Sequence, residues 1–171
     1  DMMPTVLQSI ATNYNKKNKN VALFEIGKTY TDEESNIEKG EVPTEDLKIA
    51  FALYGENADF YTVKGIIENI LEVSSIARYQ LERAKQENLH PGRSAEIFIG
   101  KDSIASFGEV HPQVLENYGI SEKVYYGVLD LNKFAKYGRD NKKYTPIPKY
   151  PAVGRDIAIV VDEDVEVGKI E

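Results

Sequence analysis

The sequence predicts an α+β protein in which helices flank an antiparallel sheet. Apolar residues recur at helical spacing near the N-terminus and again after residue 59, and short runs rich in aliphatic and aromatic residues lie between and beyond these stretches. Runs of strands interrupted by two long helices favour an antiparallel sheet over a repeated strand–helix–strand unit. The 171 residues have room for one ordinary domain and a fragment of another.

The N-terminal stretch predicts an amphipathic helix of about three turns. Its apolar residues follow the i, i+3, i+4, i+7 spacing of one helix face, at Met3, Val6, Leu7, Ile10, Ala11 and Tyr14. Pro4 fits the first turn, where its missing amide hydrogen costs nothing. The polar run 13–20 ends the helix.

Two strands joined by a long connection are predicted next. Residues Val21 to Tyr30 are rich in the aliphatic and aromatic side chains that suit a strand. An acidic loop follows from Thr31 to Asp46, and Leu47 to Tyr54 is nearly apolar throughout. Because a strand that is apolar on both faces lies inside a sheet, we expect the second strand to be central and antiparallel to the first.

A second helix is predicted after Asp59, whose carboxylate can cap its N-terminus. One apolar stripe runs along this helix and consists of Val63, Ile66, Ile67, Ile70 and Leu71. We expect the stripe to pack across the sheet, since a single apolar face must be buried against another element.

The second half of the chain predicts four short strands and one short helix. The strands are Tyr79 to Arg83, Ala95 to Ile99, Ile104 to Glu109 and Val124 to Leu131. Gly100-Lys101-Asp102 predicts the turn of a hairpin between the second and third of these strands. Residues Pro112 to Tyr118 predict a helix that Gly119 closes.

The C-terminal stretch predicts the opening of a second domain. A proline-punctuated, basic segment from Tyr144 to Arg155 leads into an apolar strand from Ile157 to Val161, and an acidic turn follows. One strand cannot bury a core of its own. We therefore expect the sequence to be a piece of a longer protein.

The distribution of charge singles out the junction before this strand. The net charge of −7 argues against a free-standing nucleic-acid binder, because Lys and Arg contacts to phosphates dominate such affinity. Between Lys133 and Arg155, however, the sequence has seven basic residues and one acidic residue, which gives a local charge of +6 between two acidic regions. This placement is compatible with a phosphate backbone at the junction, and a solvated linker is the alternative.

Composition and motifs exclude several classes of site. With no cysteine and two histidines, the chain has no thiolate metal site and little for zinc ligation. The acidic runs 32–34 and 162–164 resemble magnesium ligands only superficially, and we expect no metal site. No glycine-rich phosphate motif is present. No apolar run approaches the roughly 20 residues that span a bilayer, so we expect a soluble, cytoplasmic protein with no membrane partner.

The two histidines are the candidates for acid–base chemistry. His90 and His111 are each followed by proline beside a predicted strand. One hypothesis is a small-molecule enzyme in which His111 and Glu109 form an acid–base pair, which requires the two groups to lie within hydrogen-bond reach. The alternative interpretation, which we favour, is that each His-Pro makes a turn and its ring caps local backbone groups.

Three blocks, taken together, resemble the beta subunit of phenylalanyl-tRNA synthetase. They are NKNVALFEIGKT at 18–29; the predicted helix start at 59–65 with the later HPGRSAEIFIG and GEVHP; and PIPKYPAVGRDIAIVVD at 146–162. The resemblance implies that residues 1–140 form a non-catalytic class II synthetase module, an antiparallel sheet flanked by helices. It implies that residues 144–171 are the truncated beginning of a ferredoxin-like anticodon-binding domain.

The resemblance also implies a site without catalytic residues. A class II active site holds ATP phosphates with an arginine between two strands that would here be Val21 to Tyr30 and Leu47 to Tyr54. No arginine occurs from Asp1 to Ser75, and the acidic loop would repel a triphosphate. We therefore expect no cofactor in this fragment, while ATP and magnesium are implied for the whole enzyme.

The implied function is that of a subunit-interface scaffold with tRNA-binding support, in an enzyme that attaches phenylalanine to its tRNA with ATP. The implied partners are the catalytic alpha subunit, in an alpha2-beta2 assembly, and the tRNA for phenylalanine. The candidate tRNA contacts are Lys142, Lys143, Lys149 and Arg155, although Arg155 can instead pair with Asp156. A stand-alone protein-interaction module remains the alternative function.

Overall fold

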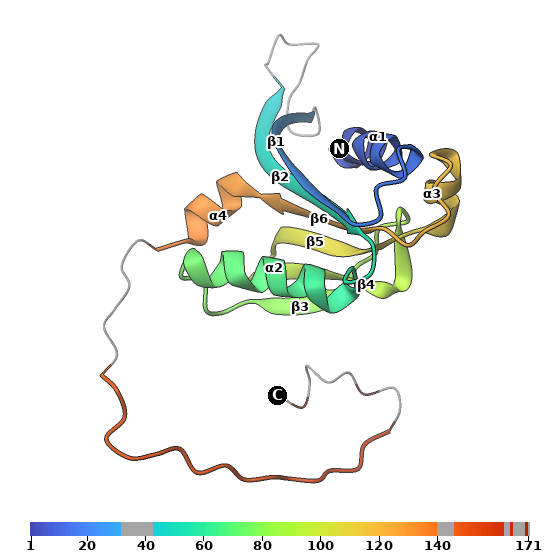
Figure 1. Ribbon diagram of the computed structural model, residues 1–171. Helices are drawn as coiled ribbons and strands as arrows, with labels where there is room; N and C mark the ends of the chain where they lie inside the picture. The colour runs from blue at the N-terminus through green and yellow to red at the C-terminus, as the bar shows by residue number, and fades with distance from the viewer. Residues whose placement is uncertain (32–42, 140–145, 163–164, 166–169, 171) are drawn as a thin grey trace. The chain divides into compact units, whose positions relative to one another are not determined.

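The computed structural model describes residues 1–31, 43–139, 146–162, 165 and 170 (Figure 1). The chain divides into two units, Asp1–Asp140 and Asn141–Glu171, called unit 1 and unit 2 below. The helices and strands are α1 (Met3–Asn15), β1 (Val21–Thr31), β2 (Thr44–Tyr54), α2 (Phe60–Val73), β3 (Gln80–Arg83), β4 (Leu89–Ile99), β5 (Asp102–Val110), α3 (Pro112–Asn117), β6 (Tyr125–Asp130) and α4 (Leu131–Tyr137).

The strands of unit 1 form one six-stranded sheet in the order β1-β2-β6-β5-β4-β3. Every neighbouring pair is antiparallel. β1 and β2 pair over their whole length, from Val21 opposite Tyr54 to Thr31 opposite Thr44. The predicted antiparallel sheet and the predicted pairing of the first two strands are therefore confirmed, and the part of the predicted acidic loop at 32–42 lies outside the described residues.

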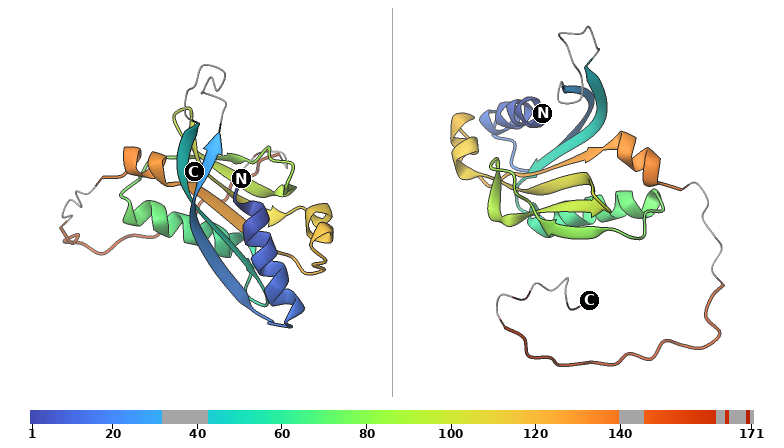
Figure 2. Two further views of the ribbon diagram at one scale, coloured as in Figure 1. Left: turned by 90° about the horizontal axis from the view of Figure 1, so that it is seen from above. Right: turned by 180° about the vertical axis from the view of Figure 1, so that it is seen from behind.

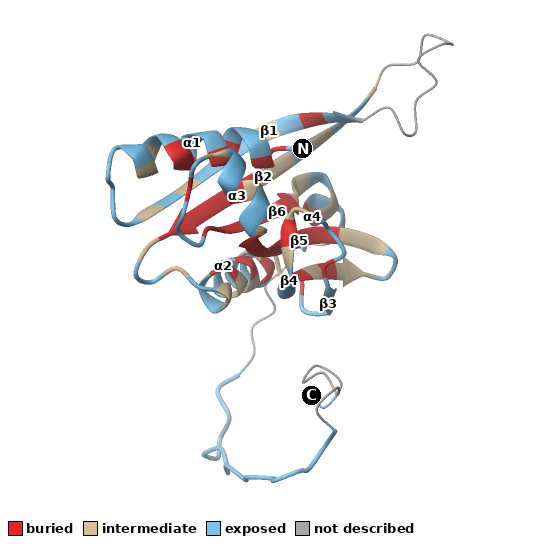
Figure 3. Ribbon diagram, turned by 90° about the vertical axis from the view of Figure 1, so that its right-hand side faces the viewer, coloured by how far each residue is buried: buried red, intermediate tan, exposed pale blue. Residues whose placement is uncertain are grey.

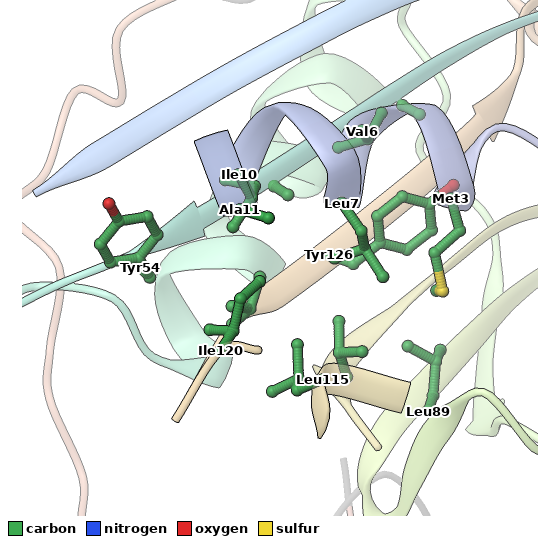
Figure 4. Close-up of a cluster of buried hydrophobic side chains, with 14 of the residues drawn as sticks. Met3, Val6, Leu7, Ile10, Ala11, Tyr54, Leu89, Leu115, Ile120 and Tyr126 are labelled. Carbon is green, nitrogen blue, oxygen red and sulfur yellow. The ribbon is translucent and has the colours of Figure 1, made fainter. Parts of the chain in front are cut away.

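Both faces of the sheet are covered, and β2 shows this most clearly. Ala52 and Tyr54 belong to one apolar cluster, which α1 and α3 cover (Figure 4). Phe51 and Leu53, which alternate with them, belong to a second cluster, which α2 and α4 cover. Figure 2 shows α1 and α2 on opposite sides of the sheet. The prediction of a strand inside the sheet and buried on both faces is thus confirmed for Ala50–Tyr54, whereas Leu47 at the start of the predicted strand is exposed.

The two long helices form as predicted, with one correction. Asp59 caps α2, because its Oδ1 accepts a hydrogen bond from the backbone N–H of Thr62 at 2.6 Å. Val63, Ile67 and Leu71 are buried. Ile66 is 37% exposed, so its place in the buried stripe was wrong. Ile66 lies at the edge of the buried helix face, whereas Ile67 and Leu71 lie in the middle of that face and pack on the sheet.

The β4–β5 hairpin turns where the sequence predicts, with Gly100 at φ +63°. β4 begins at Leu89, six residues earlier than expected, and a register shift separates its first residue from the regular ladder at Ser94. Gly108 sits opposite this irregularity at φ +157°, and a Cβ there would lie 2.5 Å from the backbone oxygen of Arg93. The glycine therefore lets the irregular strand approach its neighbour closely.

Two elements near the end of unit 1 and beyond it differ from expectation. The helix α4 was not predicted, and its only buried side chain is Phe134, which leaves little apolar periodicity in the sequence. The strand expected from Ile157 to Val161 is not present, because residues 146–162 form no helix or strand and are exposed. A strand needs a partner for its backbone hydrogen bonds, and no described residue supplies one.

None of the helices in the described residues combines the length and the apolar character that a membrane-spanning helix needs.

Candidate functional site

A cavity of about 390 Å³ opens beside the start of α1, over β2, β5 and β6. β2 contributes Lys48 to its lining, and the β3–β4 connection contributes Gln86 and Asn88. The residues that line it are Asp1, Lys48, Gln86, Asn88, Ser103, Ile104, Ala105, Ser106, Tyr126, Val128, Leu129, Asp130 and Lys133.

The charged groups of this cavity have partners within the protein. Lys133 Nζ lies 3.5 Å from Asp130 Oδ2, and Lys48 Nζ lies 3.8 Å from Asp46 Oδ2. The hydroxyl group of Ser106 donates to Gln86 Oε1 at 3.1 Å. The lining contains neither arginine nor histidine. The arrangement therefore provides a polar surface with balanced charges rather than a cradle for a triphosphate.

The described residues offer no constellation for metal chemistry. Within residues 1–31, 43–139 and 146–162, no three or more His, Cys, Asp or Glu side chains lie close enough together to hold a metal ion. The acidic run at 32–34 and part of the run at 162–164 lie outside the described residues.

Each histidine ring caps the backbone beside it, as the favoured interpretation predicted, but the turn that it predicted at His90-Pro91 is absent because both residues lie within β4. His111 Nδ1 accepts a hydrogen bond from the N–H of Gln113 at 3.3 Å and thereby caps α3. His90 Nδ1 accepts one from the N–H of Gly92 at 3.1 Å. These contacts hold both imidazole rings against local backbone.

The structure does not join His111 and Glu109 as an acid–base pair. Glu109 is buried, its Oε2 lies 3.1 Å from Arg93 Nη1, and it accepts a hydrogen bond from the Tyr125 hydroxyl at 3.5 Å. Burial, together with the charge of Glu109, raises the pKa of Tyr125. Glu109 therefore forms a salt bridge inside unit 1. The hypothesis of a small-molecule enzyme that uses His111 and Glu109 as an acid–base pair is not supported.

The basic residues between Lys133 and Arg155 include some that form ion pairs within unit 1 and some that are exposed. Lys136 Nζ lies 2.8 Å from Asp102 Oδ2, and Lys133 pairs with Asp130, so these two lysines are engaged within unit 1. Lys142 and Lys143 lie outside the described residues. Their role in binding tRNA stays a prediction.

The other two candidate tRNA contacts are described. Lys149 and Arg155 are exposed in the segment 146–162. None of the salt bridges among the described residues involves Arg155 or Asp156, and the alternative of an internal pair stays a prediction as well. Both side chains are available to an outside partner, and their contact with tRNA also stays a prediction.

An exposed apolar surface on the edge strand was not predicted from the sequence. Phe24, Ile26 and Tyr30 of β1 are 68%, 56% and 63% exposed, and Leu47 of β2 borders them. We call these four residues the β1 face. Figure 3 shows pale blue and tan along much of β1, whereas the second half of β2, its neighbour in the sheet, is red. The helices on this side of the sheet, α2 and α4, pack on β2, β5 and β6.

The hairpin register explains why these side chains share one surface. Phe24 lies opposite Phe51, and Ile26 lies opposite Ile49, so they point to the side of the sheet that carries α2. On the same side, Lys28 Nζ and Glu45 Oε2 form an exposed ion pair at 2.6 Å. The sequence of β1 has apolar residues at both sets of alternating positions, so it did not show which side of the strand α1 would cover. A contiguous exposed apolar patch on a long edge strand is typical of an interaction surface.

Comparison with known proteins gives one consistent family. Residues 1–131 match the family model described as the phenylalanyl tRNA synthetase beta chain CLM domain. The phenylalanine-tRNA ligase beta subunit of Clostridium acetobutylicum is 38% identical over 168 residues, which are 98% of this chain and 21% of that protein. The same subunit of Fusobacterium nucleatum is 39% identical over 183 residues, with 98% and 23% covered. The chain spans about a fifth of the length of these relatives.

Solved structures show the same fold at low sequence identity. A pyrrolysyl tRNA synthetase of Desulfitobacterium hafniense matches with a TM-score of 0.64 and 14% identity, over 82% of this chain and 53% of that one. A second structure of this synthetase matches with a TM-score of 0.63. The predicted fold class, a class II synthetase-like antiparallel sheet flanked by helices, is confirmed.

Proposed function

The chain belongs to the phenylalanine-tRNA ligase beta subunit family, and we propose that it is a scaffold that holds the catalytic alpha subunit of the ligase. The whole enzyme attaches phenylalanine to its tRNA with ATP and magnesium in the cytoplasm, as an alpha2-beta2 assembly. This module binds no ATP of its own and contributes a surface for the partner. Its basic C-terminal segment supports the tRNA.

The observation that carries this proposal is the β1 face. Its large side chains stay in water, while on the opposite side of the same strand Val21 and Leu23 pack against the apolar cluster that α1 covers. Moving a large apolar side chain out of water contributes about 1.5–3 kcal/mol. A surface with three such side chains on one unpaired strand edge therefore favours association with another protein surface.

The absence of phosphate-gripping groups supports the non-catalytic part of the proposal. No arginine precedes residue 78, and both lysines of the cavity lie beside carboxylates. A triphosphate entering the cavity would give up its hydration without finding a bidentate cation in exchange. The catalytic arginines are therefore assigned to the alpha subunit.

The assembly of the two subunits tests the proposal. In the full-length beta subunit, the double substitution Phe24→Ser and Ile26→Ser should weaken association with the alpha subunit by about a hundredfold, because it removes two apolar anchors. A titration followed by analytical ultracentrifugation measures this. The matched control is Tyr61→Ser with Val73→Ser, two exposed apolar residues of α2, which should leave the affinity unchanged. Equal affinities for both double variants and the parent would refute the scaffold role of this face.

A further inference from the structure

Two buried polar groups in the lining of the cavity have no partner within the protein. The Tyr126 hydroxyl and Asn88 Oδ1 make no hydrogen bond among the described residues, and both residues line the cavity of about 390 Å³. Tyr126 is 1% exposed, and its ring lies beside Met3 at the start of α1 (Figure 4). Burying such groups without a partner costs free energy. A ligand that pairs with both of them would therefore gain more than it gains on an exposed surface.

The two groups are complementary to a carboxamide. Asn88 Oδ1 is an acceptor and needs a donor, whereas the Tyr126 hydroxyl can donate to an acceptor. A carboxamide carries both functions on one carbon, an amide N–H and a carbonyl oxygen. The buried hydroxyl of Ser106, which also lines the cavity, already donates to Gln86 Oε1 at 3.1 Å. The unpaired groups of the lining are thus one acceptor and one hydroxyl.

The charged residues of the lining favour a ligand without net charge. Both lysines of the cavity lie beside carboxylates, and Asp1 Oδ1 accepts a hydrogen bond from the N–H of Met3 at 3.1 Å. A charged ligand would have to compete with these contacts and give up its own hydration. Val128 lies two residues from Tyr126 on β6, so its aliphatic side chain shares that face of the sheet. A neutral ligand with a small apolar part fits this lining.

The cavity has the size of a small organic ligand. Ligand pockets measure about 300–1,000 Å³, whereas one bound water molecule needs only about 10–15 Å³. We propose that this cavity binds a small neutral molecule that carries a carboxamide. Its amide N–H donates to Asn88 Oδ1, and its carbonyl oxygen accepts from the Tyr126 hydroxyl. This binding goes beyond the scaffold role and does not depend on it.

Ligand-observed NMR with the full-length beta subunit tests this inference, with isobutyramide as the probe. A saturation-transfer titration should give a Kd of about 1–10 mM, the range for a molecule of this size. Tyr126→Phe and, separately, Asn88→Ala should each raise this Kd about tenfold, because each removes one buried hydrogen bond. The matched control is Tyr54→Phe. It removes a hydroxyl from the same apolar cluster that pairs with Asn18 and does not line the cavity, so the Kd should stay the same.

Two probes of similar shape test the chemical class of the ligand. Methyl isopropyl ketone has a methyl group in place of the amide nitrogen and cannot donate to Asn88, and isobutyrate carries a negative charge. Each should bind the parent protein about tenfold more weakly than isobutyramide. Equal isobutyramide affinities for the parent and Tyr126→Phe, or no binding at all, would overturn the site. Ketone or isobutyrate binding as tight as that of the amide would overturn the carboxamide class.

Discussion

Two tyrosines of the apolar cluster under α1 differ in whether their hydroxyl groups have a partner. The Tyr54 hydroxyl donates to the backbone oxygen of Asn18 at 2.7 Å. The hydroxyl of Tyr126, a residue only 1% exposed, has no hydrogen-bond partner among the described residues, and burial raises its pKa. Burying an unpaired hydroxyl group costs free energy that folding must offset elsewhere.

This difference predicts opposite effects for the same substitution. Tyr54→Phe should lower the free energy of unfolding by about 1 kcal/mol, because it removes a satisfied hydrogen bond. Tyr126→Phe should leave that free energy unchanged or raise it by up to about 1 kcal/mol, because it removes an unsatisfied group. Urea denaturation of both variants measures the difference. Equal losses would show that the Tyr126 hydroxyl has a partner after all.

Gly127 makes room for an aromatic ring between two neighbouring strands. It lies opposite Phe51 in the β2–β6 pair, and a Cβ at this glycine would come within 2.4 Å of the ring of Phe51. Gly127→Ala should therefore cost about 1–3 kcal/mol of unfolding free energy through overpacking, measured by urea denaturation. Adding Phe51→Leu should cost less in this variant than in the parent, since the smaller side chain relieves the clash.

A second glycine provides the control for this prediction. Gly65 lies exposed within α2 with no atom within 4 Å of its would-be Cβ. Gly65→Ala should stabilise the protein by about 0.5–1 kcal/mol, the helix propensity difference between the two residues. A loss of stability at both glycines would mean that the cost at position 127 does not come from the ring of Phe51.

At the level of single elements, the success of prediction follows the amount of apolar surface that each element buries. α1 buries five side chains along one face, and β2 is buried on both sides, so their patterns in the sequence are strong. α4 buries Phe134 alone and is held by polar contacts to Asp102 and Ser103. Such contacts come from a hairpin about thirty residues earlier, and local sequence patterns cannot report them.

The β1 face illustrates a different limit. The run VALFEIGKTY is apolar at both sets of alternating positions, which predicts a strand without telling which side is covered. Coverage depends on where α1 and α2 pack, and only the assembled sheet determines that. The cavity has the same origin, since its lining comes from the N-terminus, β2, the β3–β4 connection, β5, β6 and α4.

For the whole molecule, the resemblance of the three sequence blocks predicted the family, which the residue patterns alone did not. The three sequence blocks identified a family that the comparisons then showed, over residues 1–131 of the chain. The candidate tRNA-binding residues have no such support, because Lys142 and Lys143 lie outside the described residues and unit 2 has no helix or strand in residues 146–162. The assignment of residues 144–171 to a ferredoxin-like domain stays a prediction.

The tRNA-supporting role predicts a salt-dependent effect in the assembled ligase. Lys142→Ala with Lys143→Ala should raise the KM for tRNA and lower the slope of log KM against log salt concentration by about 1 for each lysine–phosphate interaction that the substitutions remove. Lys16→Ala with Lys19→Ala removes the same charge from an exposed turn and should change neither quantity. Identical tRNA kinetics at low and high salt for the two double variants would contradict a phosphate contact at 142–143.

Hydrogen exchange of β1 tests the central claim, that this module is a scaffold for the alpha subunit, most directly. The measurement compares the amides of Val21–Thr31 in the full-length beta subunit alone and after assembly with the alpha subunit. A partner seated on the β1 face buries the edge strand and excludes water, so exchange in this strand should slow on assembly while exchange in α2 stays the same. Unchanged exchange throughout Val21–Thr31 in the assembled enzyme would contradict the account.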